Sequence, residues 1–188
     1  MGDRSRDLLV TGTFLAIVAA LVAMGWLTRD PAVPLADGGP APSLELPRLT
    51  GGTLGLEELR GKVVMVNIWA TWCPPCVREM PSMQRVYDAY RDDGLEIVAV
   101  AVDHRPGVAG PDGRVEGPVS EFVDRLGLTF PVVLDPTGDT ERRFGTEHLP
   151  TTVLIDRSGR VRVREVGGRS WDEEPFIGMV ESLLGEEG

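Results

Sequence analysis

The sequence predicts an α/β fold in which helices cover both faces of a mixed central sheet. From Ser43 onward, apolar runs that predict strands alternate with amphipathic stretches that predict helices. Their order is strand–helix–strand followed by a hairpin and a final helix, which places parallel and antiparallel strands in one sheet. The 188 residues, 42% hydrophobic and 26% charged, suffice for one such domain with an appendage.

Two strongly apolar segments predict the central strands. Residues 63–69 (VVMVNIW) and 95–102 (LEIVAVAV) are nearly continuous apolar runs, as expected for strands buried on both faces. Between them, residues 77–91 carry apolar side chains at helical spacing and predict an amphipathic helix.

Shorter segments predict the elements that flank this core. One hairpin is expected from 44–46 and 53–54, and a second from 151–156 and 161–166 across Ser158-Gly159. A final helix is expected over 173–184, with Asp172 as its N-cap and Pro175 in its first turn. The remaining expected elements are helical turns at 56–60 and 140–144, a helix at 119–126 and a strand at 130–134.

A long loop rich in proline and glycine is predicted at 103–118. Loops of this length inside a compact domain are usually functional or disordered. If the strand at 95–102 runs parallel to the strand at 63–69, the loop lies at the sheet edge where that first strand ends. We therefore hypothesise that this loop selects the partner of the protein.

The first 42 residues are predicted to lie outside the folded domain. Residues 8–27 form an uncharged run of 20, enough to span a hydrocarbon core of roughly 30 Å as a helix. Arg4 and Arg6, in the segment 1–7, favour a cytoplasmic N-terminus. We expect a single-pass anchor in the cell membrane, a Pro-rich linker at 28–42 and a domain at 43–188 on the extracytoplasmic side. A cleaved signal peptide is the alternative, and it exports the domain as well.

The charge balance argues against nucleic acid as a partner. The chain has 29 acidic and 19 basic residues, and its net charge of −10 would repel a phosphate backbone. Two cysteines are too few for a small fold stapled by disulfides.

The two cysteines carry the chemistry that the sequence predicts. Cys73 and Cys76 stand between a buried strand and an amphipathic helix, and helix N-termini stabilise thiolates. The three-residue offset puts them within disulfide reach, with Cys73 as the exposed nucleophile and Cys76 as the shielded resolving thiol. Pro74 and Pro75 rigidify the loop but remove two N–H donors.

Metal binding and a purely structural role are the alternatives to redox chemistry for the two cysteines. Closed structural zinc needs about four ligands, and the chain offers only His104 and His148 beside the cysteines. A copper(I) chaperone that uses the two thiolates is an alternative, because soft thiolates suit that ion. Two buried structural cysteines are a further alternative.

Two sequence blocks carry a resemblance to a known family. Residues 66–81 (VNIWATWCPPCVREMP), together with 130–135 (FPVVLD) and 149–156 (LPTTVLID), resemble the membrane-anchored thioredoxin-like proteins of the TlpA/ResA type. The resemblance covers residue 43 to the C-terminus. It implies a thioredoxin-like fold with an N-terminal hairpin extension and an inserted helix and strand, and thiol–disulfide exchange outside the cytoplasm, usually reductive.

The resemblance also implies roles for single residues. Pro150 matches the family's cis-proline, which exposes backbone to a substrate strand; the alternative is an ordinary trans turn proline. Glu79 matches a carboxylate near the cysteines that could accept the proton of Cys76, against the alternative of a solvated surface glutamate. Asn67 stands where cytoplasmic thioredoxins have a buried Asp, and an amide cannot transfer that proton.

Four residues around these groups complete the expected site. Trp72 is expected to serve as a substrate platform, whereas Trp69 is expected in the core. Pro74, Pro75 and Leu149 are expected to contact substrate beside Pro150. No cofactor is expected beyond the redox-active disulfide Cys73–Cys76.

The function implied is the reduction of disulfides in exported proteins. Apocytochrome c is one substrate that the family suggests, although Leu149-Pro150-Thr151 departs from the Pro-Glu pair of a cytochrome-dedicated branch. A membrane protein that delivers electrons from the cytoplasm is the implied upstream partner. A peroxiredoxin-like peroxidase is a further alternative, but that class has Thr or Ser three residues before its reactive cysteine, where Ala70 stands before Cys73.

Overall fold

The computed structural model describes residues 14–21, 23–24, 38–103 and 117–186. The chain divides into two units, residues 1–32 and 33–188. In the first unit, residues 14–21 and 23–24 are helical, and none of the helices within the described residues has the length and apolar character needed to span a bilayer. The predicted segment 1–7, most of the linker 28–42 and the ends of the anchor 8–27 lie outside the described residues.

The second unit is built on a five-stranded mixed sheet in the order β5-β4-β3-β6-β7. Strand β3 pairs parallel with β4, and β4 with β5, whereas β6 runs antiparallel to both β3 and β7. All residues of β3 and β4 are buried, which accounts for their continuous apolar sequences. The strand bounds are Val63–Trp69 (β3), Leu95–Ala101 (β4), Val132–Leu134 (β5), Thr151–Ile155 (β6) and Val161–Val166 (β7).

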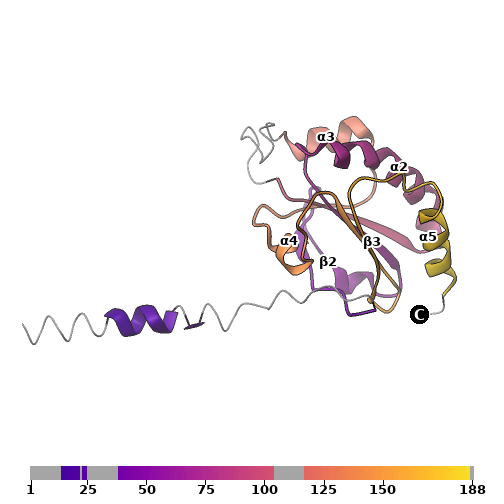
Figure 1. The fold of residues 1–188 in the computed structure, drawn as a ribbon. Helices are drawn as coiled ribbons and strands as arrows, with labels where there is room; N and C mark the ends of the chain where they lie inside the picture. The colour runs from indigo at the N-terminus through magenta and orange to yellow at the C-terminus, as the bar shows by residue number, and fades with distance from the viewer. Residues whose placement is uncertain (1–13, 22, 25–37, 104–116, 187–188) are drawn as a thin grey trace, which may run out of the picture. The chain divides into compact units, whose positions relative to one another are not determined.

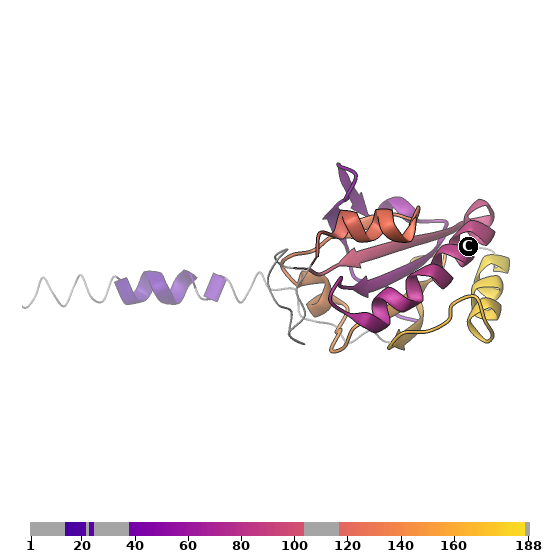
Figure 2. The ribbon, with the colours of Figure 1, turned by 90° about the horizontal axis from the view of Figure 1, so that it is seen from above.

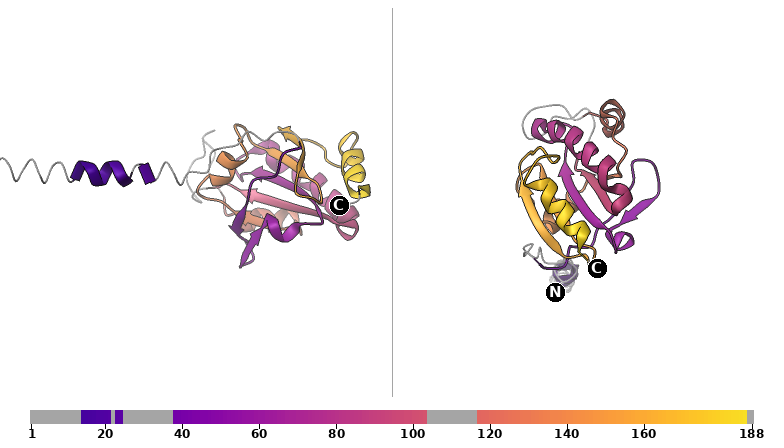
Figure 3. Two further views of the ribbon diagram at one scale, coloured as in Figure 1. Left: turned by 90° about the horizontal axis from the view of Figure 1, so that it is seen from below. Right: turned by 90° about the vertical axis from the view of Figure 1, so that its right-hand side faces the viewer.

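Helices cover both faces of this sheet, as predicted. The crossovers β3–α2–β4 and β4–α3–β5 join neighbouring parallel strands, and their right-handed sense puts α2 and α3 on one face (Figures 1 and 2). Helix α4 lies on the opposite face, seen from below in Figure 3. The helix bounds are Pro74–Tyr90 (α2), Val119–Leu126 (α3), Asp139–Arg143 (α4) and Phe176–Gly185 (α5), with 3₁₀ turns at Leu56–Leu59 (η1) and Arg91–Asp93 (η2).

The predicted N-terminal hairpin is confirmed. Strand β1 (Glu45–Pro47) pairs antiparallel with β2 (Thr53–Gly55), with Leu46 opposite Leu54. An isolated bridge between Arg48 and Val133 joins this hairpin to β5, the edge strand of the main sheet. Residues 38–41, at the end of the predicted linker, hydrogen-bond to residues 159–161 beside β7.

The predicted start of the last helix is wrong. Helix α5 begins at Phe176 with Pro175 at its N-cap, rather than at 173 with Asp172 as the cap. Steric clash with the proline ring disfavours helical backbone angles at the preceding residue, so the helix does not extend back through Glu174. The Asp172 carboxylate instead accepts a hydrogen bond from Arg85 of α2 at 2.6 Å.

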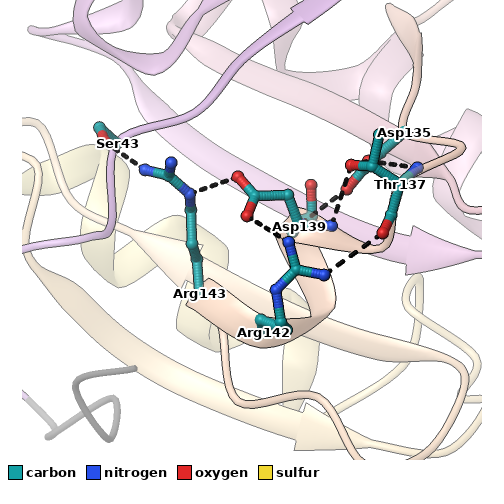
Figure 4. A network of polar contacts seen from close by, with 7 residues as sticks. Ser43, Asp135, Thr137, Asp139, Arg142 and Arg143 are labelled. Atoms are coloured by element: carbon teal, nitrogen blue, oxygen red, sulfur yellow. Dashed lines mark hydrogen bonds and ion pairs between the residues drawn. The ribbon is translucent and has the colours of Figure 1, made fainter. Parts of the chain in front are cut away.

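Helix α4 is fixed by carboxylates at its start (Figure 4). The buried Asp135 accepts hydrogen bonds from the backbone N–H groups of Thr137 (3.0 Å) and Thr140 (2.6 Å). Burial opposes ionisation of Asp135, but a hydrogen bond from the Thr137 hydroxyl at 2.6 Å and these two backbone bonds outweigh it and leave the pKa of its carboxyl lowered. Asp139 then binds Arg143, whose guanidinium also donates to Ser43. Together these contacts tie the connection between β5 and β6 to the segment before the hairpin.

Candidate active site

The two cysteines lie where β3 ends and α2 begins, as predicted. They form a disulfide, with 5.3 Å between their Cα atoms. Cys76 is fully buried and Cys73 is 4% exposed, so Cys73 is the more accessible of the two but far less open than the predicted exposed nucleophile. A substrate disulfide can therefore approach only along the side of Cys73.

At the start of α2, one backbone N–H group is placed to stabilise the Cys73 sulfur. Helix α2 begins at Pro74, three residues earlier than predicted, because prolines fit the first helical positions and Cys73 serves as the N-cap. Pro74 and Pro75 have no N–H groups, so Cys76 carries the first one that is free to donate. It points to the Sγ atom of Cys73 at 3.4 Å. The geometry thus retains one of the helix N-terminal donors for a Cys73 thiolate.

The pairing of β3 with β6 brings Pro150 to the same edge of the sheet. Ile68 lies opposite Thr151, so the residue before β6 stands beside the end of β3, which the cysteines follow. The Leu149–Pro150 peptide bond is cis, as the resemblance implies. The Pro150 carbonyl accepts a hydrogen bond from the Gly167 N–H at 2.8 Å. Pro150 itself is buried, and Leu149 is half-buried beside it.

Gly168 lies directly against the Cys-Pro-Pro-Cys turn. A Cβ atom at this position would stand 2.9 Å from the carbonyl oxygen of Pro75 and 3.2 Å from its Cβ. The first distance is shorter than real Cβ contacts and the second is tighter than most of them, and a backbone carbonyl cannot move aside as a flexible side chain can. The segment that follows β7 therefore needs glycine here to pack against the site.

Glu79 is buried, which excludes the alternative of a solvated surface residue. Its side chain is 2% exposed and accepts hydrogen bonds from Asn67 Nδ2 (2.8 Å), Trp171 Nε1 (3.0 Å) and the Arg169 N–H (3.2 Å). Burial raises the pKa of Glu79 to about 7, although all three hydrogen bonds and the Arg169 charge act to lower it. Because Cys76 and Glu79 are three residues apart on α2 and both are buried, they share one face of the helix.

Asn67 ties this carboxylate to the central sheet. Its Nδ2 group donates both to Glu79 and to Thr152 Oγ1 of β6 at 2.9 Å. Its Oδ1 atom is buried without a hydrogen-bond partner among the described residues. Glu79 is therefore the titratable group in contact with Asn67, and the amide only donates to it.

The remaining predicted residues divide between core and rim. Trp69 is fully buried, as expected, and its ring meets Phe122 of α3. Trp72 is half-buried and packs against the core, and His148 is exposed. Pro74 and Pro75 are half-buried. Within the described part of the chain, no group of three or more His, Cys, Asp or Glu side chains could hold a metal ion.

Both described ends of the predicted long loop bind one residue next to the cysteines. Asp103 accepts hydrogen bonds from the N–H and hydroxyl of Thr71, and the Gly117 N–H donates to the same hydroxyl at 3.0 Å. Both described ends of the loop therefore lie beside Thr71, two residues before Cys73 in the sequence, at the predicted sheet edge. Its interior, residues 104–116 including His104, lies outside the described residues.

The sequence patterns did not identify four of the residues that build this site. Thr71, Gly168, Arg169 and Trp171 come from loops, where no periodicity marks a buried position. A signal was present for Trp171, since it is an isolated aromatic residue in the polar stretch Ser170-Trp171-Asp172. A tryptophan in a polar loop is buried more often than its neighbours.

A match to a family model shows the protein family of the chain. The model of the AhpC/TSA family matches residues 38–164, which include the cysteines, Glu79 and Pro150. The chain belongs to the AhpC/TSA family. The thioredoxin-like fold that the resemblance implied is therefore confirmed for this AhpC/TSA member.

Curated relatives and solved structures indicate its chemistry. The chain is 38% identical over 165 residues to the thiol-disulfide oxidoreductase ResA of Geobacillus thermodenitrificans, which covers 86% of this chain and 88% of that protein. Identity to the ResA of Halalkalibacterium halodurans is 40% over 131 residues, or 70% and 69% of the two chains. The structure of a Chlorobium tepidum protein named as a DsbE thiol:disulfide interchange protein matches with a TM-score of 0.70 and 34% identity, over 80% of this chain and 99% of that one. This AhpC/TSA member is thus a thiol–disulfide oxidoreductase.

Proposed function

We propose that the protein reduces disulfides in exported proteins, using Cys73 and Cys76 as a dithiol on the extracytoplasmic side of the cell membrane. The observation that carries the proposal is the disulfide at the start of α2 together with the buried carboxylate on the same helix face. The site needs no cofactor other than this disulfide. Residues 8–27 would anchor the chain in the membrane.

The first step of the reaction is attack by the Cys73 thiolate on a substrate disulfide. One substrate sulfur leaves as a thiolate and takes up a proton, while the other forms a mixed disulfide with Cys73. The Cys76 N–H, which points to the Cys73 sulfur, favours its thiolate form. The half-buried Trp72 and the cis-Pro150 turn would position the substrate chain beside it.

The second step needs a base, because Cys76 is fully buried and must lose its proton to attack. Glu79 shares its helix face and has a pKa of about 7, so near neutral pH it is divided between an anion that can accept that proton and an acid. Attack of the Cys76 thiolate on the Cys73 sulfur releases the second substrate sulfur and closes the disulfide. That sulfur takes up the proton held by Glu79, so two electrons and two protons have passed to the substrate. A membrane electron donor must then supply two electrons, with uptake of two protons, to restore the dithiol.

The decisive experiment is a redox titration of the purified chain in glutathione buffers. A reduction potential near the value of about −270 mV known for thioredoxin supports a reductase that depends on an electron donor. A value near the −120 mV or so of a strong periplasmic oxidant would reverse the direction of electron flow. If there is no reversible two-electron transition, the proposal is wrong, and stoichiometric copper(I) retained by the two cysteines would replace it.

The identity of the substrate requires a separate test. The variant Cys76→Ser lacks the resolving thiol, so mixed disulfides with Cys73 should accumulate, and Cys73→Ser is the matched control that should trap none. For apocytochrome c, an oxidised Cys-x-x-Cys-His peptide should be reduced faster than the same peptide without the His. Equal rates on both peptides would remove cytochrome maturation from the proposal.

A further inference from the structure

The stretch 167–171, between β7 and α5, contacts the redox site at three points. The Gly167 N–H binds the Pro150 carbonyl, Gly168 packs against Pro75, and both Arg169 and Trp171 donate to Glu79. The sequence patterns gave this segment no role. Trp171 is the most deeply buried residue of this segment, with 1% of its surface exposed.

Trp171 is attached twice to the turn of α2 that carries Glu79. Its backbone N–H donates to Ser82 Oγ at 3.1 Å, and that hydroxyl donates to the Glu79 carbonyl at 2.7 Å. Its indole N–H donates to Glu79 Oε2 at 3.0 Å. The ring packs against Phe176 at the start of α5, with 5.0 Å between centroids. The indole therefore has little freedom to turn away from the carboxylate.

We propose that Trp171 is a positioning residue of the redox site, whose indole N–H holds the Glu79 carboxylate on the helix face that it shares with Cys76. The inference rests on the proposed role of Glu79 as the base for Cys76. All the hydrogen-bond partners that the structure gives the two carboxylate oxygens are donors. These donors favour the anion, which is the form that can take up a proton, and so offset part of the effect of burial.

The charged groups around Glu79 are few. Strand β3 contributes the neutral Asn67, and β6 contributes Thr152 behind it. The segment after β7 contributes Arg169, which lowers the pKa of Glu79 and is itself paired with Glu165. The indole N–H is therefore one of the few groups that offset the effect of burial on the pKa of Glu79. Its loss should raise that pKa by a measurable amount. Removing one hydrogen bond to a charged carboxylate should raise the pKa of that carboxyl by about one unit.

The test in the unaltered protein is an NMR titration of the oxidised full chain. The carboxyl carbon of Glu79, identified by its loss in Glu79→Gln, should titrate with a midpoint of about 7. The Trp171 indole N–H resonance should shift with the same midpoint and should stop shifting in Glu79→Gln. An indole resonance that does not follow the carboxyl would overturn the proposal. This measurement needs no variant of Trp171 to fold.

The variant Trp171→Phe removes the donor but keeps a ring against Phe176. The Glu79 midpoint should rise by about one pH unit, and the resolving step at pH 7 should slow about five-fold because less of the base is ionised. Ser82→Ala is the matched control, since it removes the backbone attachment of Trp171 and leaves the indole donor in place. An unchanged midpoint in Trp171→Phe, or an equal rise in Ser82→Ala, would contradict the proposal.

The outcome is separable from that of the proposed function. The titration is carried out on the oxidised protein and requires no thiol exchange, so it decides the contact between Trp171 and Glu79 even if exchange fails. In the Glu79→Gln background, Trp171→Phe should leave the pH profile of exchange unchanged. A pH-dependent effect of Trp171→Phe in that background would show that the indole acts elsewhere, which would overturn the assigned role.

Discussion

Removing the charge of Glu79 should change how the stability of the oxidised protein depends on pH. Burial raises the native pKa of this carboxyl from 4.5 to about 7, and the unfolded chain keeps the lower value. Between these two values the native state binds more protons than the unfolded state, so the free energy of unfolding falls as pH rises. At 1.36 kcal/mol for each pKa unit, the loss through Glu79 is about 3 kcal/mol between pH 4.5 and 8.

The assay is urea unfolding of the oxidised full chain and of Glu79→Gln at several pH values between 5 and 8. The variant is neutral throughout, so it should gain about 2.5 kcal/mol relative to the parent protein from pH 5 to pH 8. Asp135→Asn is a matched control at a second buried carboxyl. The pKa of Asp135 is lowered in the folded protein, so the stability it provides is present above its unfolded pKa and is lost only toward acid. Asp135→Asn should therefore be destabilised by a constant amount over this range.

A difference in stability between Glu79→Gln and the parent protein that does not vary with pH would contradict this prediction. It would mean that Glu79 has the same proton affinity in the folded and the unfolded chain. The base assigned to Cys76 would then have no raised pKa at neutral pH.

Two further substitutions test the packing and the charge of the site. Gly168→Ala puts a methyl group against the Pro75 carbonyl and should cost about 1–3 kcal/mol of stability and slow the exchange reaction. Gly52→Ala, which strains a φ of +76° in the open turn between β1 and β2, should cost about 1 kcal/mol and leave exchange unchanged. If the two variants exchange at the same rate, the contact with Pro75 has no function. Asn67→Asp brings a second carboxylate next to Glu79, so the pair should retain a proton at pH 7. The pH–rate profile should therefore shift to higher pH and show two coupled titration steps. A profile identical to that of the parent would contradict this assignment.

Much of the fold follows from local patterns. The apolar runs 63–69 and 95–102 predicted β3 in full and β4 to within one residue, because strands buried on both faces leave few polar positions, here Asn67 and Glu96. The helix at 119–126 and the strand at 161–166 were predicted to the residue. The start of α5 was missed for two reasons: the local effect of Pro175 on the residue before it was not applied, and the Arg85–Asp172 pair, which engages the expected cap, is a tertiary contact.

The redox pair and its place in the fold follow from the amino-acid sequence alone. Two cysteines three residues apart, after a buried strand and before an amphipathic helix, lie at a helix N-terminus whatever surrounds them. The burial and the raised pKa of Glu79, in contrast, depend on long-range packing. Its three donors come from residues 12, 90 and 92 positions away in the chain. Burial and hydrogen bonding of a carboxyl depend on which distant segments the fold closes over it, and no local spacing encodes that choice.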